Sequence, residues 1–152
     1  MHLIGHVFEI PTRKGLGYFQ VTHWDASMGH LVRVLDTVAN ARPSDLNSLV
    51  SRQHRFVVFF PVGHALSRRI VTDLGTFGIP AQAERFPLFR AQGPPPIDPS
   101  KPKIWSLWDG GKSRRVGLLT TDQHELPIKE IWNDTLLIHR IDDPSWRWSN
   151  DR

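Results

Sequence analysis

The eight histidines of this chain are the side chains best suited to chemistry, because imidazole binds metals and carries protons near neutral pH. A metal site needs three or four ligands that converge from rigid elements, and a His-x-x-x-His pair provides two of them only on a helix. His2 and His6 have that spacing, but they flank the start of an expected strand, where their side chains lie far apart. We therefore expect no metal site and place these histidines in solvent or at an interface.

The serine, glycine and carboxylate patterns do not form a catalytic motif. No Gly-x-Ser-x-Gly segment is present to set a serine nucleophile on a sharp turn. The turn from Gly15 to Gly17 lacks the third glycine and the following helix of a dinucleotide-binding loop. Glu125 and Glu130 act as acid and base only if the fold brings them together. The sequence thus predicts no catalytic residue and no cofactor.

The charge pattern bears on nucleic-acid binding. The formal net charge is +4, but the basic residues occur as separate pairs at expected turns, not as one stripe. These pairs are Arg13-Lys14, Arg68-Arg69 and Arg114-Arg115. Solvated turns explain such pairs more simply than a phosphate-binding face does, so nucleic acid is not the expected partner.

The expected cellular location of the protein follows from features that the sequence lacks. There is no cysteine, which excludes disulfides, thiolate zinc sites and a cysteine nucleophile. Residues 1–6 lack the basic and apolar regions of a secretion signal, and no apolar run approaches the roughly 18 residues of a membrane span. We expect a cytoplasmic protein with no membrane partner.

Tryptophan is abundant, with six in 152 residues, and could form a stacking platform or an interface. Core packing is the commoner fate of an aromatic residue in a strand. Trp105 and Trp108 are three residues apart, so they face opposite sides of a regular strand. One of the two is expected in the core, and the other is a candidate for a binding surface.

The elements that must position these residues are mostly strands. Gly15 and Gly17, and later Asp109-Gly110-Gly111, predict hairpin turns between apolar runs. The run over residues 56–60 has no polar alternation and predicts a central strand buried on both faces. Pro87 favours an edge position for its strand. Strands are expected over residues 5–11, 18–24, 31–35, 56–60, 69–74, 86–90, 104–108 and 114–119.

Short helices and loops complete one expected domain over residues 1–152. Helices are expected over residues 44–51, for one turn from Thr120, and after the capping residues 133–135, whereas residues 126–132 fit a strand or a helix equally well. The proline-rich residues 93–103 predict a loop or stiff connector. The polar tail of residues 143–152 is expected to fray. The fold class is α+β, mostly β.

The order of motifs resembles a known family. Residues 5–11 match a Gly-x-x-Phe-x-Ile-Pro strand, and residues 17–21 match a Gly-Tyr-Gly-x-Val hairpin arm, with Phe19 where glycine is frequent. The strand of residues 56–60, the Trp108-Asp109-Gly110 turn and Ile131-Trp132 follow in the same order. This pattern resembles the immunity protein 26 family of bacterial polymorphic toxin systems. The first hairpin also resembles that of SH3-like barrels, so we expect a strongly bent antiparallel sheet or a partly open SH3-like barrel with two or three short helices.

The resemblance implies a small cytoplasmic protein that binds a cognate protein toxin and protects its own cell. Inhibition would bury a toxin surface, with the affinity concentrated in a few aromatic and arginine anchors. The candidate partner-binding residues are Trp24, Arg33 and Trp105. A basic inhibitor suits an acidic toxin surface, so a nuclease is not the first target expected.

Two other functions stay open. The first is a small-ligand protein or hydrolase with a pocket formed by histidines such as His23, His30 and His64 on a barrel-like fold. The second is a nucleic-acid module that uses the paired arginines.

Overall fold

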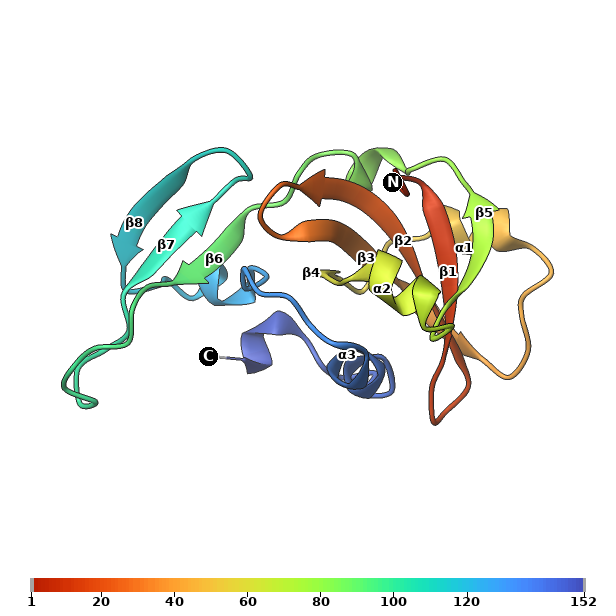
Figure 1. The fold of residues 1–152 in the computed structure, drawn as a ribbon. Coiled ribbons are helices and arrows are strands. Elements are labelled where there is room, and N and C mark those ends of the chain that lie inside the picture. Colours follow the sequence, from red (N-terminus) through yellow and green to blue (C-terminus); the bar gives the residue numbers. More distant parts are fainter. Residues whose placement is uncertain (1, 152) are drawn as a thin grey trace.

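Two antiparallel sheets make up the computed structural model, which describes residues 2–151 (Figure 1). The first sheet has five strands in the order β4-β3-β2-β1-β5, and the second has three in the order β6-β7-β8. The strands are β1 (His6–Pro11), β2 (Leu16–Asp25), β3 (Gly29–Ala39), β4 (Phe56–Phe59), β5 (Thr72–Thr76), β6 (Phe89–Gln92), β7 (Trp105–Trp108) and β8 (Ser113–Gly117). This arrangement confirms the α+β, mostly β class.

The first four strands follow one another as a meander, as the hairpin signals predict. Gly15 closes the first turn at a φ of 147°, where a Cβ atom would lie 2.6 Å from the Ala39 carbonyl oxygen. Register shifts between β2 and β3 bend the sheet at two places. Its edge strands, β4 and β5, do not pair with each other, so the sheet is not a closed barrel.

The position of β4 differs from the prediction of a central strand. It is an edge strand of the first sheet, although all four of its residues are buried. Later segments cover its outer edge, where the Trp132 backbone N–H donates to the Phe59 carbonyl at 3.0 Å and Trp148 Nε1 donates to the Val57 carbonyl at 3.0 Å. The apolar run therefore reflects burial by distant segments and not a central place in the sheet.

Three helices pack on the first sheet: α1 (Leu46–Ser51), α2 (Val62–Ser67) and α3 (Asp134–Ile141). Asp45 caps α1 by accepting from the Ser48 backbone N–H at 3.0 Å, and Asn133 caps α3 by accepting from Leu136 at 2.8 Å. The sequence did not predict α2, whose start has no side-chain cap. Short 3₁₀ turns are η1 (Ala81–Ala83), η2 (Asp122–Glu125) and η3 (Trp148–Asn150).

The core is divided by the first sheet. On one face, Phe8, Phe19 and Val58 belong to the largest apolar cluster, which also contains residues of α2, α3 and the C-terminal segment. On the other face, Tyr18 and Leu35 pack with residues of α1. No helix within residues 2–151 has the length and apolar character needed to cross a membrane.

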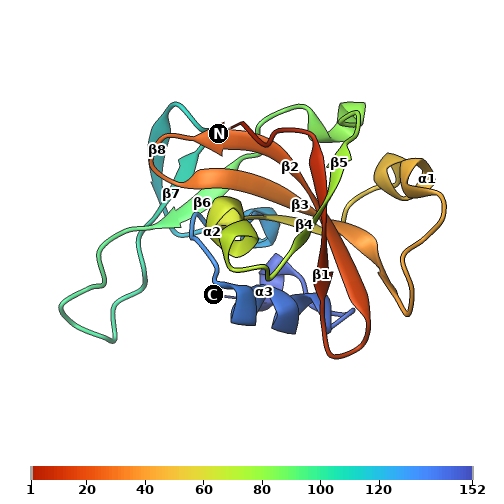
Figure 2. The ribbon, with the colours of Figure 1, turned by 45° about the vertical axis from the view of Figure 1, so that its right-hand side comes forward.

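The proline-rich segment is a hairpin loop in the second sheet, not a connector between separate parts. It joins the paired strands β6 and β7 and is closed by a hydrogen bond from the Gly93 backbone N–H to the Ile104 carbonyl at 2.8 Å. The loop projects away from both sheets (Figure 2). The edge position expected from Pro87 is confirmed for β6.

Residues 126–132 form neither a strand nor a helix but two isolated bridges, at Ile128 and Ile131.

The tail is ordered up to Asp151, so the expectation that it frays is wrong for the described residues; Arg152 lies outside them. Trp146 is 7% exposed and Trp148 is 4% exposed. Both pack on Trp132, with ring centroids 5.3 and 5.0 Å away. Two buried indoles outweigh the polar composition of the tail, because each removes a large apolar area from water.

Candidate functional site

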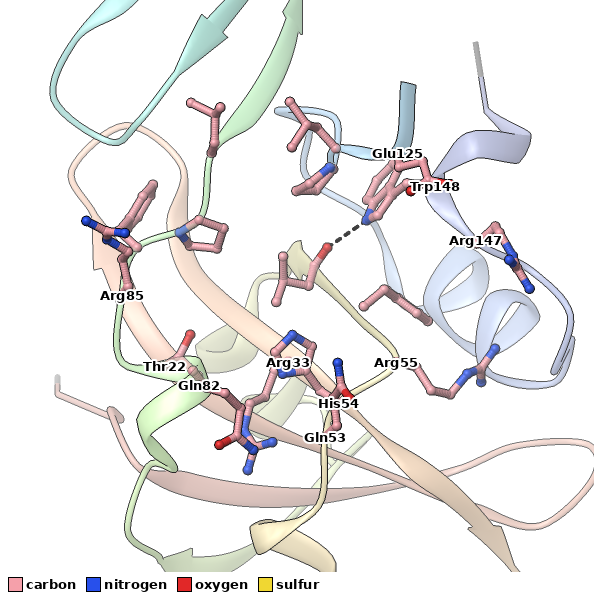
Figure 3. Close-up of a pocket in the computed structure, with 18 of the residues that line it drawn as sticks. Thr22, Arg33, Gln53, His54, Arg55, Gln82, Arg85, Glu125, Arg147 and Trp148 are labelled. Atoms are coloured by element: carbon pink, nitrogen blue, oxygen red, sulfur yellow. Dashed lines mark hydrogen bonds between the residues drawn. The ribbon is translucent and has the colours of Figure 1, made fainter. Parts of the chain in front are cut away.

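A groove of about 890 Å³ lies beside β4, where the two sheets and the C-terminal segment approach one another (Figure 3). One wall is the loop that precedes β6, and the opposite wall is the C-terminal segment. The lining comes from residues 22–23, 33, 53–57, 82–83, 85–88, 125–127, 144 and 146–149. Since these segments are far apart in sequence, the groove exists only in the folded chain.

Arg85 and Arg147 stand on opposite sides of this groove (Figure 3). Both side chains are exposed, and neither pairs with a carboxylate in the described part of the chain. The one acidic residue in the lining is Glu125. The groove therefore offers two unneutralised guanidinium groups, which suit carboxylate or phosphate oxygens.

Arg33 lies beneath the groove and is 0% exposed. Its Nε donates to Gln20 Oε1 at 2.8 Å, and Nη1 and Nη2 donate to the carbonyls of Arg52 and Val50 at the end of α1. Burial lowers the pKa of Arg33 to about 10, so the group is still a cation at neutral pH. Arg33 is wrong as a partner anchor, because its donors are turned to the fold, but its charge makes the groove more positive.

Arg55 joins the groove to the end of α3. Its guanidinium donates to the carbonyls of Ile141 at 3.0 Å and Asp143 at 2.7 Å. A cation at a helix C-terminus satisfies carbonyls that have no partner within the helix. Burial is the main cause that lowers the pKa of Arg55, and Asp36 and Asp143 oppose it. Arg55 thus fixes the start of the C-terminal segment that forms one wall.

His54 and His23 are the imidazoles of the groove. Burial, and then the charge of Arg33, lower the pKa of His54, so its ring is neutral at pH 7. Its Nδ1 atom is buried and has no hydrogen-bond partner among residues 2–151. His23 Nε2 lies 2.8 Å from the Glu84 carbonyl, so this nitrogen carries the donated proton. His23 therefore holds the loop wall against β2.

The three histidines named for a ligand pocket do not converge in this groove. His23 lines the groove, whereas His30 and His64 are not among its lining residues. Within residues 2–151, no three His, Asp or Glu side chains are grouped so that they could hold a metal ion.

The two tryptophan candidates have different surroundings. Trp24 is 58% exposed near the end of β2 and remains a candidate for partner contact. Trp105 is 5% exposed, and the guanidinium of Arg90 lies 5.2 Å from its ring centroid. Trp105 is therefore wrong as a surface anchor. Trp105 and Trp108 do belong to different clusters, as their spacing predicts, but both are buried because β7 is a central strand covered on both faces.

Sequence reasoning missed Arg85, Arg147 and His54. No motif marks them, because the groove walls are more than fifty residues apart and each arginine is an ordinary loop residue by itself. Comparison of the chain with protein-family models, with curated proteins and with solved structures gives no match. The resemblance to an immunity family remains a prediction, and the groove is the feature that bears most directly on function.

Proposed function

We propose that this chain is a non-enzymatic binding protein that neutralises a cognate protein toxin by holding an acidic segment of the toxin in the groove. The observation that carries the proposal is the pair of exposed arginines on opposite walls, Arg85 and Arg147, which pair with no carboxylate of residues 2–151. Guanidinium groups bind carboxylates with two parallel hydrogen bonds, which gives both affinity and orientation.

The rest of the groove supports the same ligand. Arg33 and Arg55 place two further cations at its base and side, and Glu125 is the one opposing charge in the lining. Leu126 and Pro127 also line the groove and can cover the apolar part of a bound peptide. The net charge of +4 would speed the approach of an acidic partner.

The resemblance to immunity proteins supplies the class of partner. A protein of that kind acts by burying a toxin surface in a stoichiometric complex. The basic groove suits an acidic toxin surface, so the basic face of a nuclease would be repelled.

Growth of bacteria that express a candidate toxin gene taken from the neighbourhood of this chain's gene tests the proposal. Wild-type chain should restore growth, whereas R85E/R147E should not, because the groove then repels acidic residues. The matched control is R68E/K101E, which makes the same charge change at two exposed positions outside the groove. Equal rescue by both variants would contradict the groove as the binding site, and failure of the wild type would contradict toxin neutralisation.

The folding of R85E/R147E can be checked separately. Because both side chains are exposed and unpaired, the melting temperature should stay within about 2 °C of the wild type. Circular dichroism during thermal unfolding measures this. A variant that melts normally and fails to protect the cell has lost binding and not its fold.

A further inference from the structure

We propose that the free edge of β8 is a second interaction surface, which adds an extended acidic segment of a partner protein to the second sheet as a fourth strand. This surface is separate from the groove, since no residue of β8 lines it. The proposal does not depend on the proposed function.

The edges of the two sheets are not equally available. The edge of β4 is covered by Trp132 and Trp148. The edge of β6 is covered by residues 127–129, where the Arg90 backbone N–H donates to the Pro127 carbonyl at 2.9 Å and Lys129 donates to the Arg90 carbonyl at 2.9 Å. Among residues 2–151, β5 and β8 are the strands left with one side unpaired.

The edge of β5 is poorly shaped for pairing. Gly75 has a φ of 98°, which departs from extended backbone. Asp73 accepts from the Gly75 backbone N–H at 2.9 Å and lies 2.9 Å from His6 Nδ1, so its carboxylate bends back onto its own sheet. An irregular edge of this kind is a known protection against pairing. The edge of β8 also has a positive-φ glycine, Gly117 at 77°, with a register shift beside it, but residues 113–115 pair with β7 in regular register. This regular stretch makes β8 the better edge for a further strand.

The side chains of β8 specify the charge of a partner strand. Arg114 and Arg115 are exposed, and neither pairs with a carboxylate in the described chain. Consecutive residues of a strand point to opposite faces, so both faces of this edge are basic. The nearby Asp109 does not offset them, because its Oδ1 accepts from the Gly111 and Lys112 backbone N–H groups at 2.9 and 2.7 Å and stays in the turn.

The positive charge of β8 also determines which kind of strand can pair with its free edge. Two copies of β8 would bring arginines opposite arginines, which disfavours a dimer through this edge. A strand with glutamate or aspartate on both faces would gain cross-strand ion pairs and backbone hydrogen bonds together. The regular stretch, Ser113 to Arg115, is at the short end of the roughly three to ten residues that are usual for strands in globular proteins.

Amide hydrogen exchange of the isotope-labelled protein tests the proposal with a blocked peptide of about seven residues in which two adjacent glutamates lie between valines, so that one glutamate faces each side of the sheet. The peptide should slow exchange within residues 113–117 by about tenfold or more, and the matched valine and lysine peptide should not. R114E/R115E should lose the effect, whereas R85E/R147E, which makes the same charge change in the groove, should keep it.

Three results would overturn the proposal. One is unchanged exchange in β8 at saturating acidic peptide. Another is self-association of R114T/R115T without any binding of the acidic peptide by the wild type, which would mean that the arginines only guard the edge. The third is a single-stranded oligonucleotide that shifts the β8 resonances while the peptide does not, with an affinity that falls steeply with salt, which would mark a nucleic-acid surface.

Discussion

Strands β1 to β4 and strands β6 to β8 pair with their neighbours in sequence, but residues 86–151 also depend on contacts between segments far apart along the chain. In the second region, Arg90 donates to the carbonyls of Leu126, Trp148 and Asp151, and Trp148 donates to Val57 in the first sheet. The first region is thus a local meander, and the second depends on a few large side chains that tie distant segments together.

The comparison separates two uses of arginine. Arg33, Arg55 and Arg90 donate to backbone carbonyls and serve the fold. Arg85 and Arg147 are exposed and lie where the two regions meet. A basic composition alone therefore does not indicate a binding surface, because part of the positive charge is used to satisfy helix ends and chain segments.

The largest expected effect is the loss of Trp148. We expect Trp148→Ala to lower the free energy of unfolding by about 3–5 kcal/mol, because it removes a buried indole from the Trp132 and Trp146 cluster and a bond to β4. Urea unfolding followed by tryptophan fluorescence measures the change. Trp148→Phe is the control, since it keeps most of the packing and should lose about 1 kcal/mol for the missing hydrogen bond. Wild-type stability of the alanine variant would mean that the tail does not hold the two regions together.

Arg90 provides the next test of the same comparison. Arg90→Met should cost about 2–3 kcal/mol, because it fills similar space but leaves the carbonyls of Leu126 and Trp148 without their donor. Hydrogen exchange should also become faster in residues 146–151 than in β1 to β3. A uniform increase across both regions would contradict a local role for Arg90.

Glu9 tests the electrostatics of the first region. It accepts from Arg42 at 2.9 and 3.0 Å and from Tyr18 Oη at 2.9 Å. Arg42 holds the pKa of Glu9 below its usual value, so this stabilisation is complete above the ordinary glutamate pKa and is lost as the pH falls through the folded-state value. Glu9→Gln should cost about 1–2 kcal/mol at pH 7 and flatten the acid limb of the stability curve. An unchanged acid limb would mean that Glu9 does not contribute to it.

Trp24 should have the smallest effect on stability. Because its ring is 58% exposed, Trp24→Ala should change the free energy of unfolding by no more than about 0.5 kcal/mol. If it is a partner anchor, as the sequence predicts, the same variant should weaken toxin binding by about tenfold or more. Leu118→Ala, at a site 67% exposed just after β8, is the matched control. Equal toxin affinity for both variants would mean that Trp24 does not contribute to toxin binding and would leave the groove as the contact surface.

The sequence predicts well the features that depend on neighbouring residues. It predicts poorly the features that depend on contacts between distant segments. The hairpin at Gly15, the turn at Asp109 and the cap at Asn133 depend on neighbouring residues, so short motifs reveal them. The edge position of β4 and the packed tail depend on contacts across some 90 residues, such as the bond from Trp148 to Val57. Nothing in a local pattern signals such a contact.

The candidate site shows the same limit. The sequence predicts arginine as one type of partner anchor, but Arg33 lies in a strand where its side chain is buried. The exposed pair lies in two loops that only the fold brings to one groove. Residue type is visible in sequence, whereas burial and convergence depend on the tertiary structure.

Titration calorimetry of the purified toxin with wild-type chain, R85E/R147E and the control R68E/K101E tests the central claim most directly. We predict one-to-one binding by the wild type, an affinity at least about 100-fold weaker for the groove variant, and a change of less than about threefold for the control. Equal loss in both variants, or no loss in the groove variant, would contradict the assignment of the two exposed arginines to toxin binding.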